Sequence, residues 1–199
     1  MYAIGGSGAP NNQLSYPYGA TYDPATGILY VADYGGHRVM SYSSGATSYV
    51  FVAGGHSTIL NNTKLYFPVG IHFDSFTNSL IIVNHNWHNV VRWKLGDANW
   101  TLLAGSAQGT SGNSATSFHS PTFITLDPMG NLYVADRNNR RIQLFLNGQS
   151  IGTTIAGISD ISGSNSSLLS IPWSIELDSQ LNLYVADASN HRIQKFLRY

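Results

Sequence analysis

The sequence predicts an all-β protein, a β-propeller built of four-stranded antiparallel blades. Three observations support this: a repeat of about 51 residues, short apolar strands, and turns rich in Gly, Ser and Asn. Four segments align with spacings of 51, 52 and 51 residues: LYVADYGGHRVMSY, IIVNHNWHNVVRW, LYVADRNNRRIQLF and LYVADASNHRIQKF. A single blade cannot bury both of its faces, so such units pack against one another. A stacked solenoid is the alternative architecture.

Each repeat is expected to hold four short strands. The first begins at a proline, which lacks an N–H and suits the start of a strand: Pro17, Pro68, Pro121 and Pro172. The second is Leu-Tyr-Val-Ala or Leu-Ile-Ile-Val, the third carries Arg-Val or Arg-Ile in three repeats, and the fourth ends in a glycine-containing turn. The turn between strands two and three should place Gly or Asn at positive φ: Gly35-Gly36, Asn86-Trp87, Asn138-Asn139 and Ser189-Asn190.

The repeats form one predicted domain over residues 1–199. The blades are expected at 17–54, 68–105, 121–157 and 172–199, with the last blade completed by a strand at 2–6. This order suits a closed four-bladed ring, which would be a monomer. Part of a larger propeller is the alternative, and its open blades would expose strand edges.

Three repeats place an Asp five residues before an Arg, across the hairpin: Asp33 and Arg38, Asp136 and Arg141, Asp187 and Arg192. The second repeat has Asn84 and Asn89 at these positions, so both charges are absent together. Leaving one buried charge unpaired costs about 3–5 kcal/mol, so joint loss indicates a structural ion pair. A ligand site formed by the three Asp residues is the alternative.

A second acidic position closes the first strand of every repeat. These residues are expected to hold the next turn through Asx hydrogen bonds: Asp23, Asp74, Asp127 and Asp178.

The third and fourth repeats show the fullest motif. They read GNLYVAD at 130–136 and LYVAD at 183–187, each followed by an Asn three residues on, an Arg-Ile-Gln triplet and a Phe. This pattern resembles the NHL-repeat family. The resemblance implies a β-propeller, usually six-bladed. It also implies functions that differ widely: protein-interaction and RNA-binding modules of tripartite-motif ubiquitin ligases, a peptide-amidating lyase and, among related propellers, lactonases.

The first strand of a blade is expected to lie nearest the propeller axis. In this strand one residue per repeat lies between two apolar residues. Because side chains alternate along a strand, its side chain is expected to point to the opposite side, toward a central channel: Thr21, His72, Thr125 and Glu176. In a four-bladed ring, His72 and Glu176 would face each other and could hold a cation or a polar ligand. A channel lined by water is the alternative. No other cofactor or metal is predicted.

The hairpin of the second repeat departs from the others, with His85, Trp87 and His88. An exposed Trp between polar residues suits an interaction surface. Simple variation of the hairpin is one alternative. A metal site is another, although no third ligand is adjacent. His37 and His191 directly precede the paired Arg and are expected to be features of the blade.

The bulk composition argues against several classes of partner. The net charge is zero, the pI is near 7.1, and the ten Lys and Arg are scattered, so nucleic acid is not expected. Without Cys there is no disulfide and no thiolate chemistry. The chain has no run of 18 apolar residues and its start lacks signal-peptide features, so no membrane association is expected. We expect a soluble protein, and both extracellular and cytoplasmic locations stay open. Three N-x-Ser/Thr acceptors would matter in a secretory pathway: Asn61, Asn99 and Asn165.

These features favour a non-catalytic propeller that binds a protein or a small ligand on a ring face or at the central channel. The repeated residues are scaffold, and neither a G-x-S-x-G elbow nor a phosphate loop occurs. One alternative is a metal-dependent enzyme of the amidating-lyase or lactonase kind. Another is a substrate- or RNA-recruiting module of a ubiquitin-ligase-type protein.

Overall fold

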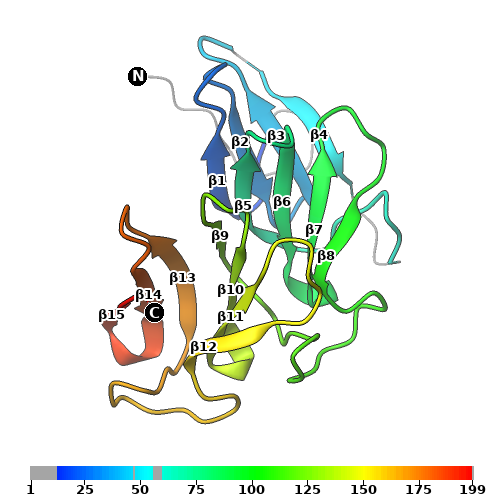
Figure 1. Ribbon diagram of the computed structural model, residues 1–199. Coiled ribbons are helices and arrows are strands. Elements are labelled where there is room, and N and C mark those ends of the chain that lie inside the picture. The colour runs from blue at the N-terminus through cyan, green and yellow to red at the C-terminus, as the bar shows by residue number, and fades with distance from the viewer. Residues whose placement is uncertain (1–12, 47, 56–59, 199) are drawn as a thin grey trace. The chain divides into compact units, whose positions relative to one another are not determined.

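The computed structural model describes residues 13–46, 48–55 and 60–198. These residues form four antiparallel sheets in which neighbouring strands follow one another along the chain (Figure 1). The first sheet contains β1 (Pro17–Tyr22), β2 (Leu29–Asp33), β3 (Arg38–Tyr42) and β4 (Val50–Gly54). The second contains β5 (Pro68–Asp74), β6 (Ser79–Asn84), β7 (Asn89–Lys94) and β8 (Thr101–Gly105). The third contains β9 (Ile124–Leu126), β10 (Leu132–Asp136), β11 (Arg141–Phe145) and β12 (Thr153–Gly157).

The fourth sheet has three strands, β13 (Pro172–Leu177), β14 (Leu183–Asp187) and β15 (Arg192–Phe196). The predicted completing strand at 2–6 lies outside the described residues. The all-β class and the propeller blades are confirmed, whereas closure of four blades into a ring stays a prediction.

The chain divides into two compact units, each with a core of its own. Unit 1 comprises residues 1–86 and 90–102, and unit 2 comprises residues 87–89 and 103–199. In unit 1 the ring of Tyr30 stacks on that of Phe73, with centroids 5.7 Å apart. In unit 2 Ile142 of the third sheet and Val185 of the fourth are fully buried in one cluster. Adjacent sheets of a unit therefore cover each other's apolar faces, as blades require.

The turns between strands two and three differ from the expectation. Positive φ does not fall on the Gly and Asn dipeptides but on the residue just before strand three: His37, His88, Arg140 and His191, at 54°, 52°, 57° and 51°. In the second, third and fourth repeats a 3-10 turn precedes this residue, namely η1 (His85–Trp87), η2 (Arg137–Asn139) and η3 (Ala188–Asn190). The left-handed residue closes the turn, because its N–H donates to the carbonyl three residues earlier, as Arg140 does to Arg137 at 3.1 Å. A short 3-10 turn thus replaces the expected two-residue hairpin loop.

Two of these left-handed histidines join one repeat to the next. His37 Nδ1 accepts the N–H of Phe67 at 3.1 Å, and His88 Nδ1 accepts the N–H of Ser120 at 3.0 Å. Phe67 and Ser120 both have a φ of 51° and directly precede the proline that starts the next repeat. The accepting nitrogen carries no proton in this arrangement. The prediction that His37 is a blade feature is confirmed.

Tyr42 is a buried phenol that should be dispensable. Its hydroxyl has no hydrogen-bond partner among the described residues, and burial is the main cause that raises the pKa of Tyr42 from about 10 to about 12. An unsatisfied buried hydroxyl costs roughly 1–3 kcal/mol, so Tyr42→Phe should leave the free energy of unfolding unchanged or raise it.

The same pKa predicts a pH dependence. A raised folded-state pKa gives stability that is present below the unfolded value and lost as pH rises through the folded value, here between about 10 and about 12. Urea denaturation across this window should show a smaller alkaline loss for Tyr42→Phe than for the parent. The exposed Tyr22→Phe controls for the removal of a phenol. Equal alkaline losses in the parent and in Tyr42→Phe would contradict the assignment.

Candidate functional site

The three predicted ion pairs are present and structural. The Arg Nε to Asp Oδ2 distances are 2.7 Å for Arg38 and Asp33, 2.8 Å for Arg141 and Asp136, and 3.1 Å for Arg192 and Asp187. All three Asp side chains are fully buried. In every pair the other carboxylate oxygen, Oδ1, accepts an N–H from the segment that leads into the first strand: those of Ser15, His119 and Ser170.

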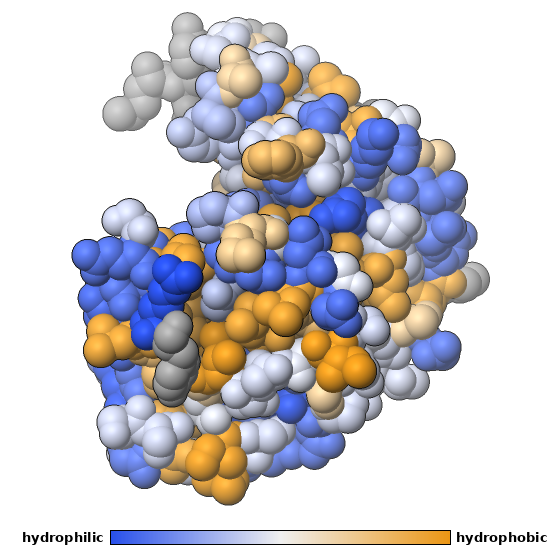
Figure 2. Space-filling model, in the orientation of Figure 1, coloured by the Kyte–Doolittle hydropathy of each residue, from blue (hydrophilic) through white to orange (hydrophobic). Residues whose placement is uncertain are grey.

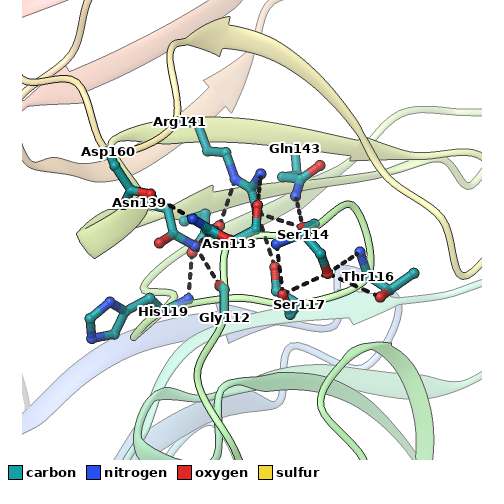
Figure 3. A network of polar contacts seen from close by, with 11 residues as sticks. Gly112, Asn113, Ser114, Thr116, Ser117, His119, Asn139, Arg141, Gln143 and Asp160 are labelled. Atoms are coloured by element: carbon teal, nitrogen blue, oxygen red, sulfur yellow. Dashed lines mark hydrogen bonds and ion pairs between the residues drawn. The ribbon is translucent and has the colours of Figure 1, made fainter.

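The guanidinium of Arg141 also holds this leading segment (Figure 3). Its Nη1 donates to the carbonyl of Asn113 at 2.8 Å, and its Nη2 donates to the carbonyls of Ser114 and Ser117 at 2.8 and 3.0 Å. Because the guanidinium donates to protein oxygens on every nitrogen, it is occupied by the scaffold. The alternative of a ligand site built on these Asp residues receives no support from this geometry.

The second repeat keeps the scaffold contact without charge. Asn84 Oδ1 accepts the N–H of Tyr66 at 3.1 Å, which is the contact that the Asp Oδ1 atoms make elsewhere. Asn89 Nδ2 donates to the carbonyl of Ser106 at 2.9 Å. Both amides are fully buried. An amide oxygen suffices for the shared contact, so the paired charges can be lost together.

The four Asp residues that close the first strand hold the following turn, as predicted. Their Oδ1 atoms accept the N–H of the residue two positions on, at 2.9, 3.0, 2.9 and 2.9 Å for Asp23, Asp74, Asp127 and Asp178. Side-chain hydrogen bonds also stabilise these carboxylates. The side-chain hydrogen bond that Asn182 donates to Asp178 is the main cause that lowers the pKa of Asp178 to about 2.

The predicted axial residues lie where a hydrogen bond links the first strands of the two sheets of a unit. In unit 2 the Thr125 hydroxyl donates to Glu176 Oε1 at 3.3 Å. In unit 1 the Thr21 hydroxyl accepts the N–H of Phe73, the residue after His72, at 3.1 Å. Thr125 is buried, whereas Glu176 is exposed. A cation or ligand held by these four side chains stays a prediction.

The predicted interaction surface at His85, Trp87 and His88 needs correction. Trp87 is only 4% exposed, so the expected exposed indole is wrong. His88 uses Nδ1 to accept the N–H of Ser120. Its ring packs edge-on against the ring of His119, with the two ring centroids 5.9 Å apart. The polar neighbours of Trp87 in sequence suggested exposure, but its side chain is buried in the fold.

Unit 2 contains a cavity that sequence reasoning missed. Its volume is about 200 Å³, and it lies between the third and fourth sheets. The lining residues are Asp127, Met129, Asn131, Tyr133, Leu144, Ile155, Leu181, Leu183, Phe196, Leu197 and Arg198. Figure 2 shows apolar side chains gathered on the visible face over β11 and β12. An apolar cavity with a few polar groups is the usual form of a small-ligand site.

The cavity runs from a buried end to an open mouth. Leu183 is 4% exposed, whereas Met129 and Leu197 are each 71% exposed. Burial, followed by the nearby charge of Asp127 and a hydrogen bond with it, raises the pKa of Tyr133. Asp127 itself is committed to its turn, because it accepts hydrogen bonds from Met129 N and from Asn131.

The residue at the position of Phe196 is larger in unit 1. Trp93 occupies the position of Phe196 in the second repeat, and both Trp93 and Trp100 belong to the buried core of unit 1. Phe196 is smaller than Trp93, and comparison of the repeats in sequence could have revealed this difference in size. Whether a smaller side chain leaves a cavity still depends on its neighbours.

The family model for the NHL repeat matches residues 118–145 and 169–196. These two segments are NHL repeats. The predicted resemblance is therefore confirmed for the third and fourth repeats, which supply both sheets around the cavity. No curated protein matches the chain in sequence.

Solved structures resemble the chain in fold. An auxiliary nutrient binding protein from Bacteroides thetaiotaomicron has 21% identity and a TM-score of 0.68 over 89% of this chain and 46% of its own. A putative gluconolactonase has 17% identity and a TM-score of 0.67 over 94% and 60%. Virginiamycin B lyase from Staphylococcus aureus has 16% identity and a TM-score of 0.60 over 92% and 56%. The chain thus spans about half the length of these structures, and the similarity concerns the fold alone.

Two further observations bear on the predicted partners. Within residues 13–46, 48–55 and 60–198, no three His, Asp or Glu side chains are grouped so that they could hold a metal ion. No helix in the same residues is long and apolar enough to cross a membrane. Asn61, Asn99 and Asn165 are all exposed, and their glycosylation stays a prediction.

Proposed function

We propose that this NHL-repeat chain is a non-catalytic binding module, and that the cavity between its third and fourth sheets receives a small ligand or a single side chain of a protein partner. The observation that carries the proposal is the cavity itself, about 200 Å³ with mainly apolar lining and one exposed cation, Arg198. This volume is below the usual range for drug-sized ligands, roughly 300–1,000 Å³. It suits one aromatic or branched aliphatic group.

The polar groups indicate which end of the ligand is recognised. Arg198 is exposed, and its backbone N–H donates to Asn182 Oδ1 at 3.2 Å. Its guanidinium can therefore meet a carboxylate at the mouth while the apolar body of the ligand enters beside Leu144, Ile155 and Phe196. The expected ligand is an apolar or aromatic group that carries an acid.

Ligand-observed NMR with indole and indole-3-acetate provides the test. We expect both compounds to bind in a saturable manner, with indole-3-acetate the tighter of the two. Arg198→Gln should remove the advantage of the acid and leave indole binding intact. Failure of both compounds to bind would contradict the proposal. So would a variant whose cavity is filled by a larger side chain, if it bound them as tightly as the parent.

The filled cavity is supplied by Phe196→Trp, which copies the second repeat. We expect this variant to fold and to lose indole binding, because the added ring occupies the space that the ligand needs. The matched control is Leu146→Trp, which adds the same indole at an exposed position outside the lining. Thermal denaturation of both variants checks that the fold is retained.

A metal-dependent enzyme is the second candidate, favoured by the lyase and the putative gluconolactonase among the similar structures. Stoichiometric metal by elemental analysis, together with turnover of a lactone or of virginiamycin B, would support it against the binding module. Turnover that survives Phe196→Trp would also place any chemistry outside the cavity.

A further inference from the structure

A second cavity lies in unit 1 and differs in character from the first. Its volume is about 430 Å³, and every residue that lines it is polar or charged: Thr77, Ser79, Arg92, Lys94, Asp97, Asn99 and Thr101. Arg92 and Lys94 are two positions apart on β7, so they lie on one face of the sheet. They are two of the ten Lys and Arg in the chain.

Arg92 lacks the hydrogen bonds that an arginine of this burial normally makes. Its side chain is 33% exposed, its Nε is buried, and Nε has no acceptor among the described residues. Its nearest carboxylate is that of Asp74, where Nη2 and Oδ2 are 3.9 Å apart, beyond hydrogen-bond distance. Asp74 already accepts hydrogen bonds from Phe76 N at 3.0 Å and Thr77 Oγ1 at 2.6 Å.

The other repeats show that this arrangement is particular to the second. The position of Arg92 is held by Ser41, Leu144 and Lys195 in the first, third and fourth repeats. Lys195 is engaged, since its Nζ lies 3.6 Å from Asp178 Oδ2 and 5.1 Å from the centre of the Tyr184 ring. Among residues 13–46, 48–55 and 60–198, the equivalent Arg92 has only the long contact to Asp74, so this part of the scaffold does not account for its guanidinium.

We propose that this cavity is an oxyanion site, in which the guanidinium of Arg92 binds the phosphate or carboxylate group of a small ligand. A guanidinium presents parallel N–H donors that match the two oxygens of such a group, and Lys94 adds a second positive charge. Asn99 and the Thr101 hydroxyl line the same cavity and can donate to the body of the ligand.

Titration with inorganic phosphate, and with acetate in parallel, tests the proposal in ¹H–¹⁵N spectra of the tryptophan indoles. The indole of Trp93 donates to the carbonyl of Asp97, which lines the cavity, and so reports on it. Trp173 lies in unit 2 and serves as the remote reference. We expect a saturable shift of the Trp93 signal with at least one of the two anions, and none with chloride at equal ionic strength.

Variants separate a defined site from a general salt effect. Arg92→Gln should weaken anion binding at least about tenfold, since hydrogen bonds to a charged group are worth roughly 1.5–3 kcal/mol. Arg92→Lys keeps the charge but not the donor geometry, so it should bind the anion more weakly than the parent and more tightly than Arg92→Gln. Asp97→Asn should tighten binding by removing a carboxylate from the lining. Lys195→Gln removes one cation at the matching position of the fourth repeat and should leave binding unchanged.

The site is overturned if neither phosphate nor acetate saturates the Trp93 shift. It is equally overturned if Arg92→Gln, shown to be folded by native Trp87 and Trp173 signals, binds as tightly as the parent. Equal losses in Arg92→Gln and Lys195→Gln would indicate attraction by overall charge rather than this cavity. The cavity between the third and fourth sheets shares no residue with this one, so failure of either proposal leaves the other standing.

Discussion

Arg141→Gln is expected to lower the free energy of unfolding by about 3–5 kcal/mol, because it leaves the charge of Asp136 buried without its partner. Asp136 is fully buried, and its Oδ2 lies 2.8 Å from Arg141 Nε. The substitution also frees the carbonyls of Asn113, Ser114 and Ser117 from the guanidinium (Figure 3). Equilibrium denaturation in urea measures the loss.

The neighbouring Arg140→Gln is the matched control. Arg140 makes a long hydrogen bond, 3.3 Å from Nη1 to the carbonyl of Asp160, at the surface. Its removal should change stability by less than about 1 kcal/mol. Losses of similar size in the two variants would contradict a special role for the Asp136–Arg141 pair.

The loss in Arg141→Gln should also depend on pH. Burial is the main cause that raises the pKa of Asp136, while the N–H of His119 acts in the opposite direction. A carboxyl with a raised folded-state pKa contributes stability that is fully present below its unfolded pKa and is lost as pH rises through the folded value. The charge of Asp136 therefore costs stability at neutral pH. The deficit of Arg141→Gln should shrink as pH falls toward the ordinary Asp value of about 3.9, because folded Asp136, with its raised pKa, takes up a proton above that value.

The second repeat suggests how the pair can be removed at lower cost. The double variant Asp136→Asn with Arg141→Asn copies Asn84 and Asn89, and it leaves no charge behind. The amide oxygen that Asp136→Asn introduces can still accept the N–H of His119, as Asn84 accepts that of Tyr66. We expect the double variant to be more stable than the sum of the two single losses predicts, which a double-mutant cycle measures.

Features that recur in the repeats were predictable from sequence, and the reason is physical. The joint absence of Asp and Arg in the second repeat indicated an ion pair, because a lone buried charge is costly. The Asp residues that close the first strand were assigned to turns because an Asx contact spans only two residues. Both predictions depend on local geometry that the repeat imposes four times.

The candidate sites were less accessible, since they depend on contacts between segments far apart in sequence. Trp87 sits among polar neighbours, yet it is buried by residues that the local pattern does not reveal. The cavity beside Phe196 is lined by residues of the third and fourth repeats, so it can be recognised only once the two sheets are packed together. The unusual state of Arg92 is likewise visible only when the distance to Asp74 is known.

Gly157→Ala is expected to destabilise unit 2 by more than about 2 kcal/mol, for two reasons that can be separated. Gly157 ends β12 with a φ of 76°, which costs a residue with a Cβ about 1–2 kcal/mol. An added Cβ would also overlap the carbonyl oxygen of Arg140, the left-handed residue before β11. Gly54 and Gly105 approach His37 and His88 in the same way, with a Cβ to carbonyl oxygen distance of 2.6 and 2.5 Å. The fourth strand ends in glycine because the backbone of the preceding turn lies against it.

Gly148→Ala isolates the first of these reasons. Gly148 has a φ of 77°, but a Cβ there would have no neighbour within 4 Å. Urea denaturation of the two variants should therefore show a loss of about 1–2 kcal/mol for Gly148→Ala, from backbone strain alone. The excess loss in Gly157→Ala measures the overlap with the carbonyl of Arg140. Arg140 closes its 3-10 turn and also packs against the end of β12. Equal losses of stability in Gly157→Ala and Gly148→Ala would therefore show that this contact can relax and that the turn is less tightly held than the structure indicates.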